Sequence, residues 1–317
     1  MSRPPATPER CIELWITYLQ VHGAMPKCIS DYEMGAKRTI EIFAANGKET
    51  LPYKWTEKEL LWIKKYWESD HVRPDGTRSG PLAVKTVKVY MCILTSIAKH
   101  YGNDVGKTAR LKYKQDTRPS VDWLTFDDAK KLIGAYMTPL QRIAIHLMLQ
   151  LAMRRVECIR MKADIGDLDR RSFNVDGKAH KRRTVPFHRD TDRILAAWME
   201  VRSELEREAK AFARRTHRKF VNSDALLVWR CGPELRPYSE KGTGFDKQIT
   251  NKLSKQLGMK IRNHTLRRTW GRETHYVGKA DISELSLVYG HSNPVTTMRY
   301  IGVDGERLVE TVNKTPF

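Results

Sequence analysis

The chain has 317 residues, of which 40% are hydrophobic, so it is long and apolar enough to form cores in two domains. Lys and Arg number 57 against 37 Asp and Glu, which gives a formal net charge of +20. The composition excludes a disordered basic tail, and the charge favours a polyanionic partner, most commonly nucleic acid; a basic protein without such a partner is the alternative.

Several classes of protein are excluded by what the sequence lacks. No apolar run approaches the roughly 18 residues of a transmembrane helix, and the first residues lack the apolar core of a signal peptide. We therefore expect no membrane association and a cytoplasmic, nucleoid-associated protein. The five cysteines form no CxxC pair and the histidines form no HExxH motif, so we expect no disulfide framework, no metal site and no cofactor.

The first hundred residues predict four helices. Polar residues that can cap a helix precede apolar segments at Thr7, Ser30 and Thr56, which predicts the starts of the first three helices. Apolar residues at spacings of three and four predict a fourth helix over about 82–101, after a turn-rich loop over 71–80. We therefore predict a helical domain over residues 1–105.

Residues 106–120 are rich in Lys and Arg and end in Pro-Ser, which predicts a basic linker to a second domain over 121–317. Such a connector can lie along a DNA backbone. The predicted DNA-contacting residues come from the fourth helix, the linker and a later hairpin, and for the fourth helix a solvated face is the alternative. They are Lys85, Lys88, Lys107, Arg110, Lys112, Lys114 and Lys181.

The second domain predicts a mixed α+β fold, so the whole chain is expected to be mainly α with a small β-hairpin. Short strands are predicted over 171–175 and 182–187, joined by an Asp-Gly turn, and residues 221–245 read as a loop. Thr125 is a predicted helix cap. The predicted helices are about 127–136, 139–151, 190–218, 247–257, 266–278, 281–289 and 304–313.

Two elements of this domain carry candidate site residues: the end of an apolar helix and the tip of the predicted hairpin. An apolar helix ends at Arg154, and Glu157 follows three residues later, where its carboxylate can reach the same face. The hairpin turn presents Lys178 at its tip, and Lys181 is an alternative for the same position.

Two further elements follow near the carboxyl end. His264 and Arg267 are three residues apart, so both side chains can face one ligand. His291 follows Gly290, and Tyr300 comes nine residues after this histidine. Taken singly, these residues could be an intrahelical ion pair, a backbone cap, a turn or a core tyrosine.

The ordered set of Arg-x-x-Glu, hairpin Lys, His-x-x-Arg, Gly-His and Tyr resembles the tyrosine recombinase/integrase family, which includes phage-type integrases and Xer-type recombinases. The resemblance covers about 120–317, and all positions occur in the family's order. The sequence departs from the family pattern at Tyr289, where leucine is usual. Arginine pairs at 154/155 and 267/268 leave open which member of each pair faces the phosphate.

The resemblance implies a role for each residue in phosphodiester cleavage. Arg154 and Arg267 would bind the non-bridging phosphate oxygens, with Glu157 orienting Arg154. Tyr300 would be the nucleophile, and His264 the candidate base that takes its proton.

The remaining two side chains act on the leaving group and the phosphate. Lys178 would protonate the leaving 5′-oxygen, and His291 would hydrogen-bond the phosphate. Because the arginines supply the positive charge, no divalent metal, ATP or other cofactor is implied.

The resemblance also implies an assembly. The two domains would clamp double-stranded DNA, and four protomers, a dimer at each target site, would act through a Holliday junction. Residues 304–317 would be exchanged between neighbours, or would pack on their own domain. Accessory DNA-bending factors are possible partners, and a topoisomerase of type IB, a non-catalytic DNA clamp and a metal-dependent nuclease are the alternative functions.

Overall fold

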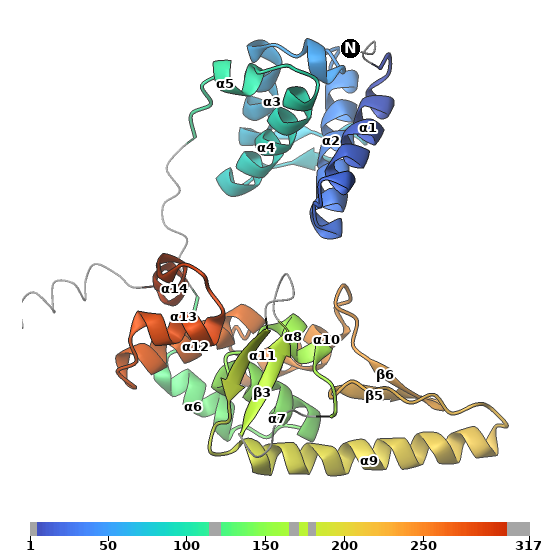
Figure 1. Cartoon of the computed structure of the whole chain (residues 1–317), viewed down its shortest axis with the longest axis vertical. Helices are drawn as coiled ribbons and strands as arrows, with labels where there is room; N and C mark the ends of the chain where they lie inside the picture. The colour runs from blue at the N-terminus through green and yellow to red at the C-terminus, as the bar shows by residue number, and fades with distance from the viewer. Residues whose placement is uncertain (1–4, 114–121, 165–170, 177–181, 303–317) are drawn as a thin grey trace, which may run out of the picture. The chain divides into compact units, whose positions relative to one another are not determined.

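The computed structural model describes residues 5–113, 122–164, 171–176 and 182–302. The chain divides into two compact units, Met1–Pro119 and Ser120–Phe317, whose elements are labelled in Figure 1. Each unit has its own buried apolar core. Within the described ranges, no helix is both long and apolar enough to cross a bilayer.

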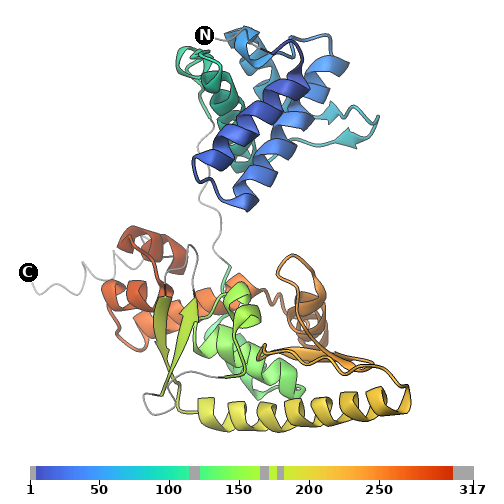
Figure 2. The ribbon, with the colours of Figure 1, turned by 45° about the vertical axis from the view of Figure 1, so that its right-hand side comes forward.

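Unit 1 is a helical bundle, seen in blue to green in Figures 1 and 2. Its core is rich in aromatic side chains, among them Trp15, Phe43 and Trp67, which are almost completely buried. The four predicted helices are present, with a short β-hairpin inside the predicted 71–80 loop. The elements are α1 (Pro8–Val21), α2 (Pro26–Ala45), η1 (Pro52–Lys54), α3 (Glu57–Glu68), β1 (His71–Val72), β2 (Arg78–Ser79), α4 (Val84–His100) and α5 (Val105–Thr108).

Two of the three predicted helix starts in unit 1 are confirmed. Thr7 caps α1, and Thr56 forms a capping box with Glu59 at α3. The start predicted at Ser30 is wrong, because α2 begins at Pro26 and Ser30 lies one turn inside it. Proline at the first helical position has the helical φ and no N–H group that needs an acceptor, so it favours a helix start at Pro26, which has no side-chain cap.

Packing of unit 1 continues into the range proposed as a linker. Ala109 is buried in the core of unit 1, and the ring of Tyr113 lies under the ammonium groups of Lys64 and Lys88, 5.5 and 5.4 Å from the ring centroid. Cation–π contacts of this kind attach the chain to the α3–α4 face.

Unit 2 is mainly helical with two small antiparallel hairpins. Strands β3 (Ser172–Asp176) and β4 (Arg182–Pro186) pair with Phe173 opposite Val185, and both of these side chains are buried. The helices are α6 (Phe126–Gly134), α7 (Pro139–Ile145), the π-helical turn η2 (His146–Gln150), α8 (Arg155–Arg160), α9 (Thr191–Arg215), α10 (Gly244–Gln248), α11 (Thr250–Leu257), α12 (Asn263–Tyr276), α13 (Ile282–Tyr289) and α14 (Pro294–Ile301). The predicted fold class, mainly α with a small hairpin, is confirmed.

The loop predicted over 221–245 is wrong. It contains the hairpin of β5 (Val228–Cys231) and β6 (Glu234–Pro237), which lies alongside α9 in Figures 1 and 2. Strands of four residues give too short an alternation to detect in sequence, and their formation depends on burying Val228 and Leu235 in the unit 2 core beneath α9.

Helix α14 was not predicted from the sequence, although Asn293 caps it and Pro294 occupies its first turn. The helix predicted over 304–313 lies outside the described residues.

Candidate active site

The predicted site residues that the structure describes in unit 2 lie on α8, α12 and α14 and just after α13. An apolar segment leads into the first of these helices. The segment ends after η2 at Ala152, whose φ of 52° places its backbone in the left-handed region. Arg154 then occupies the N-cap position of α8. Arg267 lies in the second turn of α12, and Tyr300 in the last turn of α14.

Glu157 is buried among arginines. Its Oε1 accepts a hydrogen bond from Arg154 Nη1 at 2.7 Å, and its Oε2 accepts from the Arg154 amide at 2.7 Å. Although burial alone would raise it, the pKa of Glu157 lies below its usual value because Arg183, the Arg154 amide and Arg267 stabilise the carboxylate. Glu157 is therefore ionised and pairs with Arg154, which the spacing of three residues allows.

Arg183, on β4, is a site residue that the sequence reasoning missed. Its Nη2 donates to Glu157 Oε2 at 2.7 Å, its Nη1 donates to the Val288 carbonyl, and its side chain is 8% exposed. Arginine is abundant in this hairpin, and nothing in the local sequence distinguishes this one from Arg182. Only the pairing of β4 beside α13 brings it to the carboxylate.

The carbonyl of Tyr289, at the end of α13, is a shared acceptor for two arginines. Arg154 Nη2 donates to it at 3.0 Å and Arg267 Nη2 at 2.8 Å. The last carbonyls of a helix lack intrahelical partners and carry the negative end of the helix dipole, so they attract cations. One backbone atom thus fixes the spacing of the two guanidinium groups.

Arg267 is almost completely buried. Its Nη1 donates to the Ala152 carbonyl, and its guanidinium lies over the Tyr289 ring, 4.4 Å from the centroid. Burial, followed by repulsion from Arg154 and Arg183, lowers its pKa to about 10, so it stays protonated at neutral pH. Three guanidinium groups face the one carboxylate of Glu157, which leaves two positive charges to receive an anion.

The Tyr300 hydroxyl lies 3.3 Å from Nδ1 of His264, and Arg268 lies 5.1 Å from the Tyr300 ring centroid. Burial raises the pKa of Tyr300, against the opposing effect of Arg267 and Arg268, so the hydroxyl is protonated at neutral pH. Desolvation and the nearby Arg268 lower the pKa of His264, which leaves this imidazole neutral and able to accept a proton.

His291 comes after Gly290, the residue that caps α13, and stacks on Tyr289, with ring centroids 5.1 Å apart. Its Nδ1 lies 2.9 Å from Thr297 Oγ1. Burial and the surrounding arginines lower its pKa to about 4, so the ring is neutral at neutral pH. Together with Arg154 and Arg183 it lines an open cavity of about 480 Å³.

Tyr289, the departure from the family pattern, is accommodated by a glycine. Its hydroxyl donates to the Arg267 carbonyl at 2.8 Å, and the side chain is fully buried. A Cβ at Gly271 would lie 1.8 Å from this hydroxyl oxygen. The larger ring therefore fits only because position 271 has no side chain.

The structure distinguishes the two members of each arginine pair by their contacts. Arg155 donates to Asp246 and to the Glu240 carbonyl, away from the Tyr289 carbonyl that binds Arg154. Arg268 lies against the Tyr300 ring, whereas Arg267 shares the carbonyl with Arg154. The structure thus brings together Arg154, Glu157, His264, Arg267, His291 and Tyr300.

Other predicted residues lie elsewhere. Lys178, Lys181 and Lys114 are outside the described residues. Lys85, Lys88, Lys107, Arg110 and Lys112 belong to unit 1 and are exposed, and Lys107 pairs with Asp104 at 3.0 Å. Among the described residues, no group of three or more His, Cys, Asp or Glu could hold a metal ion.

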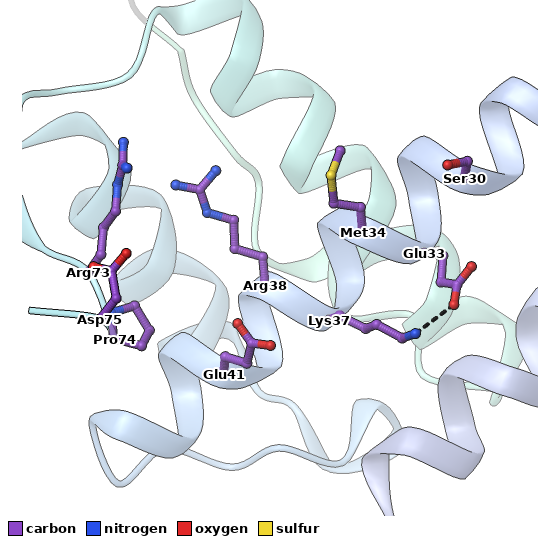
Figure 3. Close-up of a pocket in the computed structure, with 9 residues that line it drawn as sticks. All are labelled: Ser30, Glu33, Met34, Lys37, Arg38, Glu41, Arg73, Pro74 and Asp75. Atoms are coloured by element: carbon purple, nitrogen blue, oxygen red, sulfur yellow. Dashed lines mark hydrogen bonds and ion pairs between the residues drawn. The ribbon is translucent and has the colours of Figure 1, made fainter. Parts of the chain in front are cut away.

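Unit 1 has an open pocket of about 610 Å³ between α2 and the β1–β2 hairpin. Figure 3 shows the guanidinium groups of Arg38 and Arg73 extending in the same direction, while Lys37 pairs with Glu33. Arg38 also donates to the Tyr90 hydroxyl at 3.2 Å, which connects α2 to α4. The pocket carries both signs of charge, because Glu41 and Asp75 also line it.

Known proteins are similar to this chain in sequence. Tyrosine recombinase XerC of Corynebacterium glutamicum is 27% identical over 172 residues, 54% of this chain and 49% of that protein. Tyrosine recombinase XerA of Thermococcus kodakarensis is 26% identical over 314 residues, 97% of this chain and 95% of that protein. The chain spans about half the length of the XerC relatives that it matches.

Solved structures show the same fold. The XerH site-specific recombinase in a post-cleavage complex with palindromic difH substrate superposes with a TM-score of 0.66 at 16% identity, over 98% of this chain and 85% of that one. The Tn1549 transposon integrase in complex with circular intermediate DNA gives 0.64 at 14% identity, over 96% and 99%.

The family described as "Phage integrase family" matches residues 122–307, which is more than half of the chain and contains every residue of the site above. The chain is therefore a member of the phage integrase family of tyrosine recombinases, similar to the Xer proteins.

Proposed function

We propose that the chain is a site-specific DNA recombinase that cleaves and rejoins DNA through a 3′-phosphotyrosine intermediate at Tyr300. The observation that carries this proposal is the Tyr300 hydroxyl, which lies beside a neutral His264 and within the electrostatic influence of Arg154 and Arg267. These two guanidinium groups are paired at the Tyr289 carbonyl. The recombinase names of the relatives support the same activity.

The charge of the site suits the reaction. Attack by an oxygen nucleophile on a phosphodiester builds a second negative charge on the non-bridging oxygens. Two positive charges remain after Glu157 is neutralised, and they match the charge of this transition state. Fork-shaped guanidinium groups bind two oxygens at once, so Arg154 and Arg267 are the proposed ligands of the phosphate.

The nucleophile needs a base because burial keeps the Tyr300 hydroxyl protonated. We assign this role to His264, whose Nδ1 lies at 3.3 Å. The phosphorus–oxygen bond to Tyr300 replaces the bond to the 5′-oxygen, which takes a proton from Lys178. Because bond energy is kept in the tyrosyl ester, rejoining needs no ATP.

The experiment that tests this function uses a nicked suicide duplex that traps the covalent intermediate. Incubation should give a protein–DNA conjugate that survives denaturation, and Tyr300→Phe should abolish it while DNA binding remains. A non-catalytic clamp would give no conjugate with either protein. A metal-dependent nuclease would lose activity in EDTA, whereas the proposed enzyme keeps it.

A topoisomerase of type IB would also form the conjugate, so products must be examined. Recombinants between paired target sites support the proposal, whereas supercoil relaxation without recombinants from any paired site would contradict it. Binding-site selection from random duplexes supplies the target.

For the assembly, we propose four protomers on two DNA duplexes, with residues 304–317 exchanged between neighbours. Unit 2 offers an apolar groove of about 380 Å³ between α6 and α12 that could receive such a segment. Phe126, Ile133 and Val277 line this groove and are exposed. Deleting residues 304–317 should abolish tetramers on DNA and leave binding by single protomers; tetramers of the truncated chain would contradict this assignment.

A further inference from the structure

His291 is connected to two hydroxyl groups that the sequence analysis did not single out. Its Nδ1 lies 2.9 Å from Thr297 Oγ1, and Thr297 Oγ1 lies 2.8 Å from Ser286 Oγ. Both hydroxyl-bearing residues are buried, on α14 and α13 respectively. A buried relay of this kind determines which ring nitrogen of a neutral histidine carries the proton.

The direction of each hydrogen bond follows from counting protons. Ser286 donates its hydroxyl proton to the Ile282 carbonyl at 2.6 Å, and a carbonyl can only accept. Ser286 Oγ therefore accepts from Thr297, which uses the single hydroxyl proton of Thr297. Thr297 Oγ1 is then left to accept, and the remaining partner, His291 Nδ1, has to donate.

We infer that Thr297 and Ser286 are positioning residues that fix His291 as the Nδ1–H tautomer and leave Nε2 as the proton acceptor of the ring. The stacking of the ring on Tyr289 holds its plane while the relay fixes its protons.

This tautomer has a consequence for the phosphate. A neutral imidazole without a proton on Nε2 cannot donate a hydrogen bond to a phosphate oxygen from that atom. His291 therefore donates from Nε2 only after that atom has taken up a proton, and Thr297 makes Nε2 the nitrogen that receives it. The catalytic consequence rests on the proposed function, whereas the tautomer does not.

The chain offers matched controls. Thr297→Val removes the hydroxyl and keeps the shape, while Thr297→Ser keeps the hydroxyl. Thr296→Val makes the same chemical change at the neighbouring residue, which is exposed. Ser286→Ala leaves Thr297 in place but removes its hydrogen-bond acceptor.

The first test is the tautomer itself, measured by long-range proton–nitrogen correlation spectra of the full chain with ¹⁵N-labelled histidine. The His291 signals are assigned by their loss in His291→Gln. The wild-type chain, Thr297→Ser and Thr296→Val should show Nδ1–H, and Thr297→Val should shift His291 toward Nε2–H. An Nε2–H tautomer in the wild-type chain, or no change in Thr297→Val, would overturn the inference.

The second test is the rate of covalent cleavage of the suicide duplex, measured beside DNA affinity. Thr297→Val removes the hydroxyl that accepts the Nδ1 proton, so the protonated ring that donates from Nε2 to the phosphate is less stable. Covalent cleavage should therefore slow about tenfold with unchanged DNA affinity, and Thr297→Ser should cleave at the wild-type rate. Equal cleavage by Thr297→Val and the wild-type chain would refute the positioning role. If no variant forms a conjugate, the proposed function fails, and the spectra still decide the tautomer.

Discussion

At the scale of single residues, the site depends on the carboxylate of Glu157. Only one of the three arginines around it, Arg154, is close to it in sequence. Arg154 is three residues from Glu157 and could be paired with it from the sequence. Arg183 is 26 residues away and reaches Glu157 only through the β3–β4 hairpin. Contacts set by helical periodicity were predictable, and contacts set by tertiary pairing were not.

Arg183 gives a prediction at this scale. Arg183→Gln should reduce the rate of covalent cleavage about 10- to 100-fold, because Glu157 Oε2 loses one partner and can draw Arg267, now 3.8 Å away, from the phosphate. Arg182→Gln is the matched control, since its side chain is exposed and pairs with Asp176 at 3.1 Å. The measurement is single-turnover cleavage of the suicide duplex; equal rates for both variants would contradict the prediction.

At the scale of elements, α12, α13 and α14 form one packed group beneath the site. The departure of Tyr289 from the family pattern was visible in the sequence, but its complement at Gly271 was not, because the two positions meet only when α12 packs on α13. The same limit applies to α14, whose cap at Asn293 and first-turn proline read as a turn in sequence.

The pairing of residues 271 and 289 is tested by a double-mutant cycle. Gly271→Ala should lower the free energy of unfolding by about 1–3 kcal/mol, because the added methyl group overlaps the Tyr289 hydroxyl. In a chain that already carries Tyr289→Leu, Gly271→Ala should lower the free energy of unfolding clearly less. Urea unfolding of the four proteins measures both values, and additive losses would show that the positions do not interact.

Burial of His146 in the π-helical turn η2 predicts that unit 2 loses stability in acid. His146 is buried there, with Nδ1 2.6 Å from Gln150 Oε1 and Nε2 2.9 Å from Thr191 Oγ1. Burial lowers its pKa from an ordinary 6.5 to about 4. Between pH 6.5 and about pH 4 the unfolded chain binds a proton at His146 and the folded chain does not. The contribution of His146 to the free energy of unfolding is therefore fully present above this pH range and is lost as the pH falls through it.

His146→Asn should therefore make stability less dependent on pH. From neutral pH to about pH 4.5, the free energy of unfolding should fall by about 2 kcal/mol more for the wild-type chain than for the variant. Chemical unfolding at several pH values measures the two slopes. His22→Asn, at an exposed histidine, is the control, and parallel slopes for His146→Asn and the wild-type chain would contradict the assignment.

At the scale of the whole molecule, the charge of +20 predicted a polyanionic partner, and the family match agrees with it. The composition could not say which cations contact DNA. A basic residue on an exposed helix face looks the same in sequence whether it binds phosphate or water, so the DNA contacts of Lys85 and Lys88 stay predictions.

Salt dependence tests these contacts. The logarithm of DNA affinity should fall steeply and linearly with the logarithm of salt concentration, and Lys85→Ala and Lys88→Ala should each reduce this slope by about one. Lys210→Ala is the control, because this lysine pairs with Glu206 at 2.6 Å on α9. A flat response to salt, or equal slopes for all three variants, would exclude the proposed contacts.

The atom that sets the spacing of Arg154 and Arg267 is the main-chain carbonyl oxygen of residue 289, so this spacing tolerates substitutions at that position. No amino-acid replacement at position 289 deletes that oxygen, so the side chain there is free to vary as long as the interior accommodates its bulk. Tyr289 therefore leaves this acceptor in place, as a leucine at the same position would. The spacing of the two guanidinium groups depends on where α13 ends and not on which side chain stands at its last residue.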